Sequence, residues 1–499
     1  MLSENRRVDV VVVGCGNAAL CAALSARENG ANVVVLEKSP EAWRGGNSAF
    51  SGGNLRFAFN DVKDIYELVP DLSDSEKAGM EVIPYTHENF FDDLARLTEF
   101  QTDGELASTL IENSFSTLKW MRTKGVRMIL TKGQSASSKG GKRRFKGGLF
   151  LEVVGGGRGL VDYLLDRAID EGVEIRYASK ATRLLRDTNG AISGVEVHGE
   201  DGPYEIHAPS VVLASGGFEA NPEMRCRYLG PGWDLAKVRG TPYNTGDGLG
   251  MAMEIGVQPY GHWSGCSAVS WDLNAPPHGN ISAPEPYQRN GYPIGIVVNA
   301  MGNRFFDEGS DFQNYTNSKY GKQIMAQSMR TAFQIFDRKT IDLLGDAYRS
   351  RKATMVEANT LEELAKNLEI DVEGFVDTVQ SFNAAVLPGE FNTDIKDGKA
   401  TQGIHPPKSN WALPIDEPPY WGFSVTSGIT FTFGGVRVNT KGQVLNTENN
   451  IIPGLFAAGE LVGGIFFFDY PNGAGLVSGA VYGRLSGLGA AKYASNGAS

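Results

Sequence analysis

The pattern of apolar residues near the N-terminus predicts a strand, a helix and a second strand in succession. The run from Val8 to Val13 is rich in valine and stops at a glycine, which is typical of a parallel strand buried on both faces. The alanine-rich segment 18–29 predicts a helix, and Gly30 after it suits a left-handed cap. The second strand is predicted over Asn32–Leu36. This order indicates an α/β fold.

A glycine-rich turn joins the first strand to the helix and has the spacing of a dinucleotide fingerprint. In GCGNAA, Gly14 allows a tight turn, Gly16 lets a pyrophosphate approach the backbone, and Ala19 lets the helix pack closely on the strand. Glu37 ends the second strand 21 positions after Gly16, where the ribose-binding carboxylate belongs. A glutamate there favours a ribose with a free 2′-hydroxyl. NAD and FAD both fit this unit.

Segments further along the chain favour FAD over NAD. Residues 43–48 (WRGGNS) and 51–54 (SGGN) offer glycine pairs and backbone N–H groups to a flat ring system. A predicted strand over 208–217 ends in a glycine pair, and another over 452–460 ends in AAGE. The segment 472–479 (NGAGLVSG) enters a helix, whose N-terminus would stabilise negative charge on a reduced flavin.

Composition narrows the class of protein without indicating a substrate. Glycine accounts for 62 of 499 residues, about 12%, above the usual value of about 7%. The net charge of −11 argues against a nucleic-acid partner. No apolar stretch is long enough for a transmembrane helix, and MLSENRRVDV leads straight into the first strand without a signal peptide. We therefore expect a cytoplasmic protein.

The four cysteines, at positions 15, 21, 226 and 266, show neither metal-ligand spacing nor a redox pair. We expect them to be reduced and buried, and we expect no metal site. The polar, basic stretch 132–146 predicts a surface loop.

Eight short segments, taken together and in order, resemble the flavoprotein superfamily of fumarate reductase, succinate dehydrogenase and 3-ketosteroid dehydrogenase. They are GCGNAA, VVLEK, RGGNS, VVLASGGFEAN, NTGDGLGMA, VVNAMGNRFFDE, GGVRVNTKGQVL and IPGLFAAGE. The resemblance implies one FAD and hydride transfer between flavin N5 and a substrate carbon. In the membrane-complex members a histidine after the RGG segment carries FAD covalently. Phe50 and Ser51 occupy that neighbourhood here, so we expect non-covalent FAD.

The resemblance also implies the fold class and its division into domains. We expect a Rossmann-like FAD-binding domain of the glutathione-reductase type, formed by residues 1–260 and 420–499, with an α+β capping domain inserted at 261–419. Helices are predicted in the cap over Gln323–Met329, Leu361–Leu368 and Val372–Phe382.

On the fingerprint and the family segments together, we expect the cofactor to contact residues from the whole length of the FAD-binding domain. The candidates are Gly14, Gly16, Asn17, Ala18, Ala19, Glu37, Lys38, Arg44, Gly45, Gly46, Asn47, Ser48, Ser51, Gly52, Gly53, Ala181, Ala214, Ser215, Gly216, Asn221, Asp247, Gly459, Glu460, Gly475, Leu476 and Val477.

The chain departs from fumarate reductases where those enzymes hold and protonate substrate. Their catalytic arginine would fall at Phe312, their histidine before the TxGG turn is missing around Thr432, and DYPN at 469–472 replaces an arginine. WRGGNS, DEGSDFQNYT and FFDYPNGAGL instead resemble FAD-dependent tricarballylate dehydrogenases. One departure from that group is AFSG at 49–52, where we expect a basic residue or histidine.

Desaturation beside a carboxylate or ketone needs an oxyanion holder, a base for the α-proton and a flavin for the β-hydride. Our candidate holders are Arg56, Arg289, His262 and Tyr470. Our candidate bases are Tyr315, with a pKa lowered by nearby arginine, then Tyr470 and then Asp311. Arg304 and Glu308 are expected to form a structural ion pair.

The leading hypothesis is an FAD-dependent dehydrogenase of a small polycarboxylate, converting tricarballylate to a product of the cis-aconitate type. The alternatives are a desaturase or ene-reductase of a cyclic ketone, and a fumarate-reductase-like flavoprotein that needs a redox partner. Five phenylalanines, at 431, 433 and 466–468, favour a less polar substrate if they line the pocket. Electrons would pass to an acceptor protein or to oxygen. We expect a monomer or homodimer.

Overall fold

A six-stranded, mostly parallel sheet forms the centre of the computed structural model, which describes residues 8–131, 136–139, 142–145, 150–282 and 286–496. Five strands are parallel and the edge strand β20 is antiparallel to β21. The order across the sheet is β20 (Gln443–Leu445), β21 (Ile451–Ala457), β13 (Ser210–Leu213), β1 (Val10–Val13), β2 (Val33–Leu36) and β9 (Glu174–Arg176). All four valines of β1 are buried, as expected for a central parallel strand.

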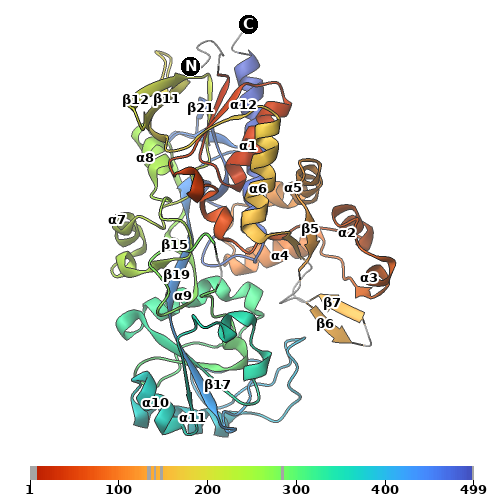
Figure 1. The fold of residues 1–499 in the computed structure, drawn as a ribbon, viewed down its shortest axis with the longest axis vertical. Coiled ribbons are helices and arrows are strands. Elements are labelled where there is room, and N and C mark those ends of the chain that lie inside the picture. Colours follow the sequence, from red (N-terminus) through yellow and green to blue (C-terminus); the bar gives the residue numbers. More distant parts are fainter. Residues whose placement is uncertain (1–7, 132–135, 140–141, 146–149, 283–285, 497–499) are drawn as a thin grey trace.

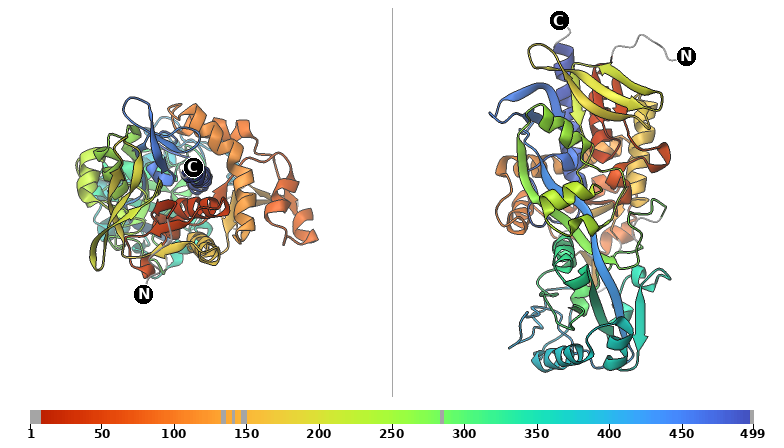
Figure 2. Two further views of the ribbon diagram at one scale, coloured as in Figure 1. Left: turned by 90° about the horizontal axis from the view of Figure 1, so that it is seen from above. Right: turned by 90° about the vertical axis from the view of Figure 1, so that its left-hand side faces the viewer.

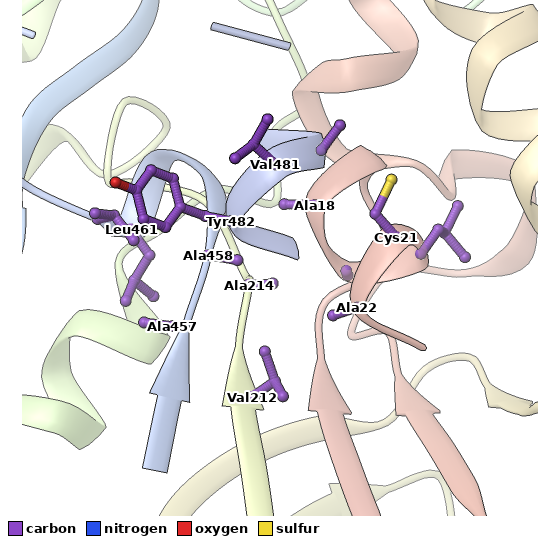
Figure 3. Close-up of a cluster of buried hydrophobic side chains, with 14 of the residues drawn as sticks. Ala18, Cys21, Ala22, Val212, Ala214, Ala457, Ala458, Leu461, Val481 and Tyr482 are labelled. Atoms are coloured by element: carbon purple, nitrogen blue, oxygen red, sulfur yellow. The ribbon is translucent and has the colours of Figure 1, made fainter. Parts of the chain in front are cut away.

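Helices cover this sheet. α1 (Asn17–Glu28) packs on the sheet, on α6 (Gly156–Asp170) and on α12 (Ala474–Asn496), and α12 itself also contacts β13 and β21. The predicted cap after α1 is present, because Gly30 has φ +88°. Figure 3 shows the apolar cluster in which α1 and α12 meet the ends of β13 and β21. Small residues allow this close packing: a Cβ on Gly487 would lie 2.1 Å from the Ala22 carbonyl oxygen.

Smaller sheets and helices surround the central sheet. An antiparallel sheet at one end of the molecule contains β10 (Lys180–Arg186), β11 (Ile192–Gly199) and β12 (Gly202–His207), next to α8 (Asp247–Glu254) (Figure 1). On the side, β3 (Asn54–Arg56), β8 (Phe150–Val153) and β5 (Met128–Leu130) pair beside α2 (Val62–Leu68), α3 (Asp74–Ala78), α4 (His87–Leu97) and α5 (Gly104–Thr123).

The basic stretch predicted as a loop lies partly outside the described residues. Its described parts, β6 (Ala136–Lys139) and β7 (Lys142–Phe145), form a hairpin that pairs with β4 (Met80–Glu81). The cysteines are all free, and three are buried, but Cys226 is exposed, which corrects our expectation for that residue.

Two long strands connect the central part of the molecule to its far end. β15 (Pro259–Asp272) and β19 (Tyr420–Val436) pair antiparallel, and both extend along the long axis of the molecule (Figures 1 and 2). At the far end β19 pairs with β17 (Ala332–Asp337) and β18 (Met355–Ala358), and β17 pairs with β16 (Ile296–Val298). Most residues between β15 and β19 lie at this end. Our expected domain limits fall at the first residues of these strands: 260/261 lies at the end of the pair nearer the central sheet, and 419/420 lies at the far end.

The helices of the far end are α9 (Asn317–Met325), α10 (Leu361–Leu368) and α11 (Val372–Ala385). The last two match the predicted segments closely. The prediction of a helix over Gln323–Met329 was wrong by about a turn and a half, since α9 begins at Asn317, directly after the segment DEGSDFQNYT. Gly321 lies within α9, where a Cβ would come 2.3 Å from the backbone of Ala268 on β15. The glycine is there for close packing and does not end the helix.

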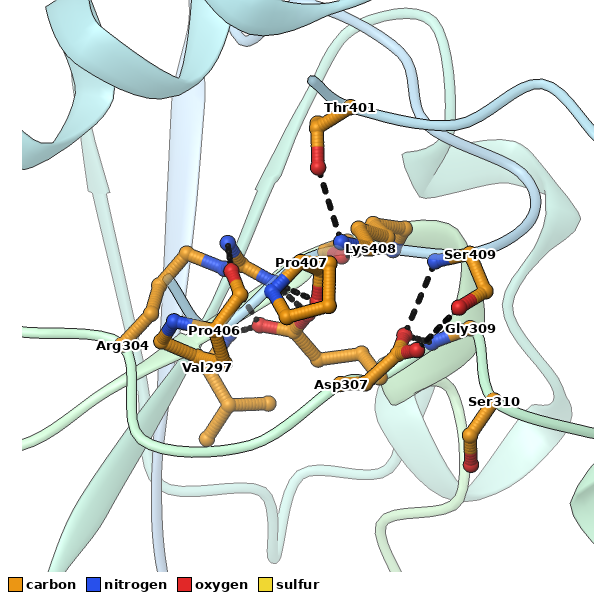
Figure 4. A network of polar contacts seen from close by, with 12 residues as sticks. Val297, Arg304, Asp307, Gly309, Ser310, Thr401, Pro406, Pro407, Lys408 and Ser409 are labelled. Carbon is orange, nitrogen blue, oxygen red and sulfur yellow. Dashed lines mark hydrogen bonds and ion pairs between the residues drawn. The ribbon is translucent and has the colours of Figure 1, made fainter. Parts of the chain in front are cut away.

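The predicted ion pair of Arg304 and Glu308 is present in the cap. Figure 4 shows the polar cluster around Arg304 and Lys408. The side chains of Arg304 and Glu308 lie 2.5 Å apart and are almost fully buried. Next to them Lys408 donates to the main-chain oxygens of Pro293 and Gly295. Burial lowers the pKa of Lys408 to about 8. Within the described residues, no helix has the length and apolar character needed to cross a bilayer.

The close contact of α12 with α1 leads to a stability prediction. Gly487→Ala should lower the free energy of unfolding by about 1–3 kcal/mol, because the new methyl group would overlap the Ala22 carbonyl. The matched control is Gly250→Ala on α8, where a Cβ meets nothing within 4 Å and alanine should stabilise the helix by about 1 kcal/mol. Thermal unfolding measured by circular dichroism checks both. Equal Tm changes in the two variants would contradict the packing argument.

Candidate active site

A cavity of about 440 Å³ lies at the carboxyl ends of the central strands and extends toward the cap. In α/β sheets this edge is where ligands bind. Most candidate cofactor residues line it: Gly14, Gly16, Asn17, Ala18, Glu37, Lys38, Gly46, Asn47, Ser48, Ser51, Gly52, Gly53, Ala181, Ala214, Ser215, Gly216, Asp247, Gly459, Glu460, Gly475 and Leu476.

The turn after β1 is held tightly against the end of β13. Gly14 has φ +107°, and a Cβ there would lie 2.4 Å from the Ala214 carbonyl oxygen, so only glycine fits. Asn17 joins two further loops to this turn, since its main-chain N–H donates to Ser48 Oγ (3.1 Å) and its Nδ2 donates to the Leu476 carbonyl (2.7 Å). The N-termini of α1 and α12 both reach the cavity wall and provide partial positive charge for phosphate groups.

At one end of the cavity the polar groups suit a ribose. The Glu37 carboxylate is buried and accepts a hydrogen bond from the Ser39 main-chain N–H (2.8 Å). Burial raises its pKa. Asp247, the first residue of α8, forms ion pairs with Lys38 (2.5 Å) and Lys180 (2.7 Å).

Five candidate cofactor residues do not line the cavity but support its walls. Ala19 and Val477 are fully buried. A Cβ on Gly45 would lie 2.8 Å from the Val161 side chain. Arg44 forms an ion pair with Asp162 (3.0 Å), and Asn221 caps the short helix α7 (Pro222–Met224). The structure therefore places these five residues behind the cavity wall and not in direct contact with a cofactor.

Toward the cap, the cavity is lined by aromatic and polar residues. Of the candidate catalytic residues, Tyr470 is here, with its ring 4.9 Å from that of Phe431 and 5.3 Å from that of Phe466. Phe433 also lines the cavity, whereas Phe467 and Phe468 do not. Sequence reasoning missed the polar residues at this end: Arg239, Gln288, Asn290, Asn317 and Thr430.

Our expectation that Arg289 holds substrate is not met. Its guanidinium is fully buried in an ion pair with Asp272 (2.8 Å), whose carboxylate is also fully buried, and it donates to the Ala347 carbonyl (3.1 Å). The neighbouring residues Gln288 and Asn290 line the cavity instead. Side chains alternate in direction along extended backbone, so Gln288 and Asn290 reach the cavity while Arg289 between them does not. The sequence QRN at 288–290 did indicate binding residues, but we chose the arginine and not its two neighbours.

Arg56, Tyr315 and Asp311 also lie behind the cavity wall. Arg56 Nε donates to the carbonyl of Asn472, a cavity residue (2.7 Å), and its Nη1 lies 3.4 Å from the Tyr315 hydroxyl. Tyr315 donates to Asp93 (2.7 Å), which is linked through Arg96 to Asp311.

Burial raises the pKa of Tyr315 to about 12, although Arg56 acts to lower it. Our expectation of a tyrosine with a lowered pKa is therefore wrong, because removal from water outweighs the charge of Arg56. Tyr315 is not suited to act as the base.

His262 packs beside the cavity without lining it. Its Nδ1 accepts a hydrogen bond from the Phe468 main-chain N–H (3.1 Å), and its ring stacks on Phe467 at 5.8 Å. Burial, together with the nearby charge of Lys322, lowers its pKa to about 4. His262 is thus neutral at pH 7 and positions this turn, which corrects its assignment as a substrate holder.

Asp469 links the cap to the loop that carries Tyr470. One carboxylate oxygen accepts from Ser318 Oγ on α9 (2.6 Å) and from the Tyr470 main-chain N–H (2.8 Å). Its Oδ2 is buried without a hydrogen-bond partner among the described residues. Burial raises the pKa of Asp469 to about 6.

Comparison with known proteins identifies the family. A family model described as "FAD binding domain" matches residues 9–476. The chain is 30% identical over 490 residues to a fumarate reductase (cytochrome) of Shewanella frigidimarina, covering 97% of this chain and 77% of that protein. It is 28% identical to a 4-oxocyclohexanecarboxylate 2-dehydrogenase of Sinomonas cyclohexanicum, covering 96% of this chain and 91% of that protein.

Among solved structures, the open conformation of a flavocytochrome c3 fumarate reductase superposes with a TM-score of 0.72 at 27% identity. The match covers 99% of this chain and 79% of that one. The chain therefore belongs to the FAD binding domain family, within the fumarate reductase and succinate dehydrogenase flavoprotein superfamily. It is an FAD-dependent oxidoreductase that acts on carbon–carbon bonds. The predicted fold class and FAD are confirmed.

The residues at the cavity fit FAD. Gly14 and Gly53 lie where a Cβ would meet backbone within 3 Å, two helix N-termini reach the wall, and Glu37 lies at the end suited to ribose. FAD supplies a hydride acceptor or donor at its ring when bound.

The buried carboxyl of Asp469 leads to a pH-dependent prediction. A carboxyl whose pKa is raised from about 4 to about 6 stabilises the fold below pH 4, and this contribution is lost as the pH rises through 6. Asp469→Asn removes the penalty of ionisation. The free energy of unfolding of this variant relative to wild type should therefore increase by about 2–3 kcal/mol between pH 4 and pH 7.

Urea unfolding at several pH values measures this difference. Asp201→Asn, at an exposed turn, serves as the control and should show no such trend. A difference between Asp469→Asn and wild type that stays constant with pH would refute the prediction.

Proposed function

We propose that this enzyme desaturates a carbon–carbon bond adjacent to a carboxylate of a small carboxylic acid, with non-covalent FAD as the hydride acceptor. The observation that carries the proposal is the presence of Arg239 and Tyr470 on the wall of the FAD cavity. A small polycarboxylate of the tricarballylate type remains the predicted substrate.

Arg239 has the position of an anion holder. Arg239 lines the cavity at a distance from Lys38 and Lys180, which lie at the ribose end and form ion pairs with Asp247. Arg239 lies on the cap side, where its main-chain N–H donates to the Ile429 carbonyl (2.8 Å) and its guanidinium lies 6.0 Å from the Trp271 ring centroid. An arginine fork matches a carboxylate and stabilises negative charge that develops on it.

Amide side chains complete a polar surface beside the arginine. Gln288, Asn290 and Asn317 line the cavity, and the Oδ1 atoms of both asparagines are buried without a partner in the described part of the chain. Such atoms favour a ligand with hydrogen-bonding oxygen groups, because a buried polar atom left unpaired costs about 1–3 kcal/mol. These amides are suited to a second polar group of the same substrate.

Tyr470 is the one candidate base that lines the cavity. We assign to its hydroxyl the movement of a proton at the substrate α-carbon, with Arg239 withdrawing charge from the adjacent carboxylate. The aromatic wall of Phe431, Phe433 and Phe466 excludes water around the reacting carbons.

A cyclic ketone substrate is the second candidate, favoured by the same tyrosine and its aromatic neighbours. A tyrosine hydroxyl stabilises an enolate-like oxygen as readily as it moves a proton. The Sinomonas relative is a dehydrogenase of 4-oxocyclohexanecarboxylate, a compound with both a ring ketone and a carboxylate. Electrons would then pass to a separate acceptor, a protein or oxygen.

The experiment is anaerobic mixing of the purified holoenzyme with a panel of donors while flavin absorbance is recorded. Tricarballylate and related polycarboxylates should bleach the flavin, because Arg239 would hold their carboxylate in the same cavity as the flavin. Bleaching by cyclic ketones that carry no carboxylate, and by no acid, would overturn the proposal in favour of the second candidate. Bleaching by no donor, with reoxidation of reduced enzyme by unsaturated acids, would show a reductase.

Arg239→Gln tests the anion holder. The rate of flavin bleaching by the active acid, as kcat/KM, should fall about 10²–10³-fold, the usual loss for one charge-stabilising donor, while FAD content stays unchanged. Arg183→Gln is the matched control, since Arg183 is exposed and paired with Glu196 (2.7 Å). Equal rates in the Arg239→Gln variant and the control would remove Arg239 from the site.

A further inference from the structure

Two glutamates meet behind the cavity because they follow neighbouring parallel strands. Glu219 comes after β13 and Glu460 after β21, and these strands pair in register. Glu219 is fully buried, and Glu460 lines the cavity. Gly217 makes room for the contact, since a Cβ there would lie 2.2 Å from Glu460 Oε1. The two carboxyl groups interact with each other through their side chains.

The hydrogen bonds around Glu219 define which oxygen carries a proton. Its Oε1 accepts from Asn47 Nδ2 (2.5 Å) and Asn244 Nδ2 (2.6 Å). The orientation of Asn47 is fixed, since its Oδ1 accepts from the Thr241 N–H and its Nδ2 also donates to the Thr430 carbonyl. Oε1 is therefore an acceptor. The other oxygen, Oε2, is buried and receives no hydrogen bond from the described residues.

Glu460 has the complementary arrangement. Its Oε1 accepts from the Thr432 main-chain N–H (2.7 Å) and from Thr432 Oγ1 (3.1 Å), which stabilises the ionised form. A proton on Glu219 Oε2 that is donated to Glu460 would satisfy the one buried oxygen left unpaired.

Arg225 is the cation beside the pair, and its hydrogen bonds within the described residues go to main-chain oxygens and not to either carboxylate. The titratable groups that face the pair are Arg225 and Cys266. Arg225 donates to the main-chain oxygen of Glu219 (2.5 Å), and its other donors are used by the carbonyls of Trp233 and Asp234. Burial, together with the adjacent Glu460, raises the pKa of Glu219 well above its usual range. Two ionised carboxylates in contact and out of water would repel strongly.

We propose that Glu219 and Glu460 share a single proton, and that the pair thereby presents one negative charge, rather than two, to the bound FAD. Glu219 is then a positioning residue that acts through Glu460, and the charge of the pair contributes to the reduction potential of the flavin. The proposal depends on FAD binding in this cavity and does not depend on the substrate.

The charge state can be measured through the flavin potential. Glu219→Gln keeps one negative charge, because the glutamine amide can donate to Glu460 as the shared proton does. The potential at pH 7 should therefore equal that of wild type. The double variant Glu219→Gln with Glu460→Gln removes the charge. It should favour reduced flavin about tenfold, which is a rise of about 30 mV for a two-electron couple.

Each alternative gives a different pattern. A rise in potential for Glu219→Gln alone would show that both carboxyls are ionised in wild type. An unchanged potential in the double variant would show that the pair carries no charge felt by the flavin. Either result overturns the proposal.

Infrared spectroscopy of the holoenzyme gives an independent readout. A protonated carboxyl band should be present at pH 7–8, should shift on 13C labelling of glutamate, and should be lost in Glu219→Gln. Asp469→Asn is the matched control for another buried carboxyl, and should keep this band. Absence of a glutamate band in labelled wild type would overturn the proposal even where a variant fails to bind FAD.

Discussion

The contact between the Gly14 turn and the end of β13 is the constraint on which the site depends. Because that turn lies against the Ala214 carbonyl, the N-terminus of α1 is fixed at the edge of the sheet. Asn17 then joins it to the Ser48 loop and to the first turn of α12. Three segments, the outer two 459 residues apart in the chain, meet here through one asparagine. The wall of the FAD cavity is thus assembled from main-chain groups, which explains the high glycine content.

The sequence predicted the part of the site that main-chain geometry determines. Gly14, Glu37 and Ser48 lie where their spacing placed them, because a fingerprint turn and its flanking strands leave little freedom. The ends of helices were less predictable. The start of α9 was missed, and the packing against Ala268 that explains Gly321 inside this helix is a long-range contact.

The substrate end of the cavity could not be predicted in the same way. Arg56, Arg289 and Tyr315 have the right chemistry, but burial and partners decide what each can do. Arg289 pairs with Asp272 in the cap, and the pKa of Tyr315 is raised because desolvation outweighs a neighbouring charge. Arg239 was overlooked since nothing in its local sequence marks a binding residue. Its position depends on β19, nearly 190 residues further along the chain.

The long strand β19 has a mechanical consequence. It runs without interruption from the far end of the cap, where it pairs with β17, to Thr432, whose N–H donates to Glu460 at the FAD cavity. Its pairing with β15 shifts register at two places, between His262 and Cys266 and between Ser267 and Ala268, but the strand itself is continuous. A displacement of β19 would move Thr432, and with it a hydrogen bond to the carboxyl pair. One strand thus joins the part of the cap at β17 to the carboxyl pair at the FAD cavity through main-chain pairing and a single hydrogen bond.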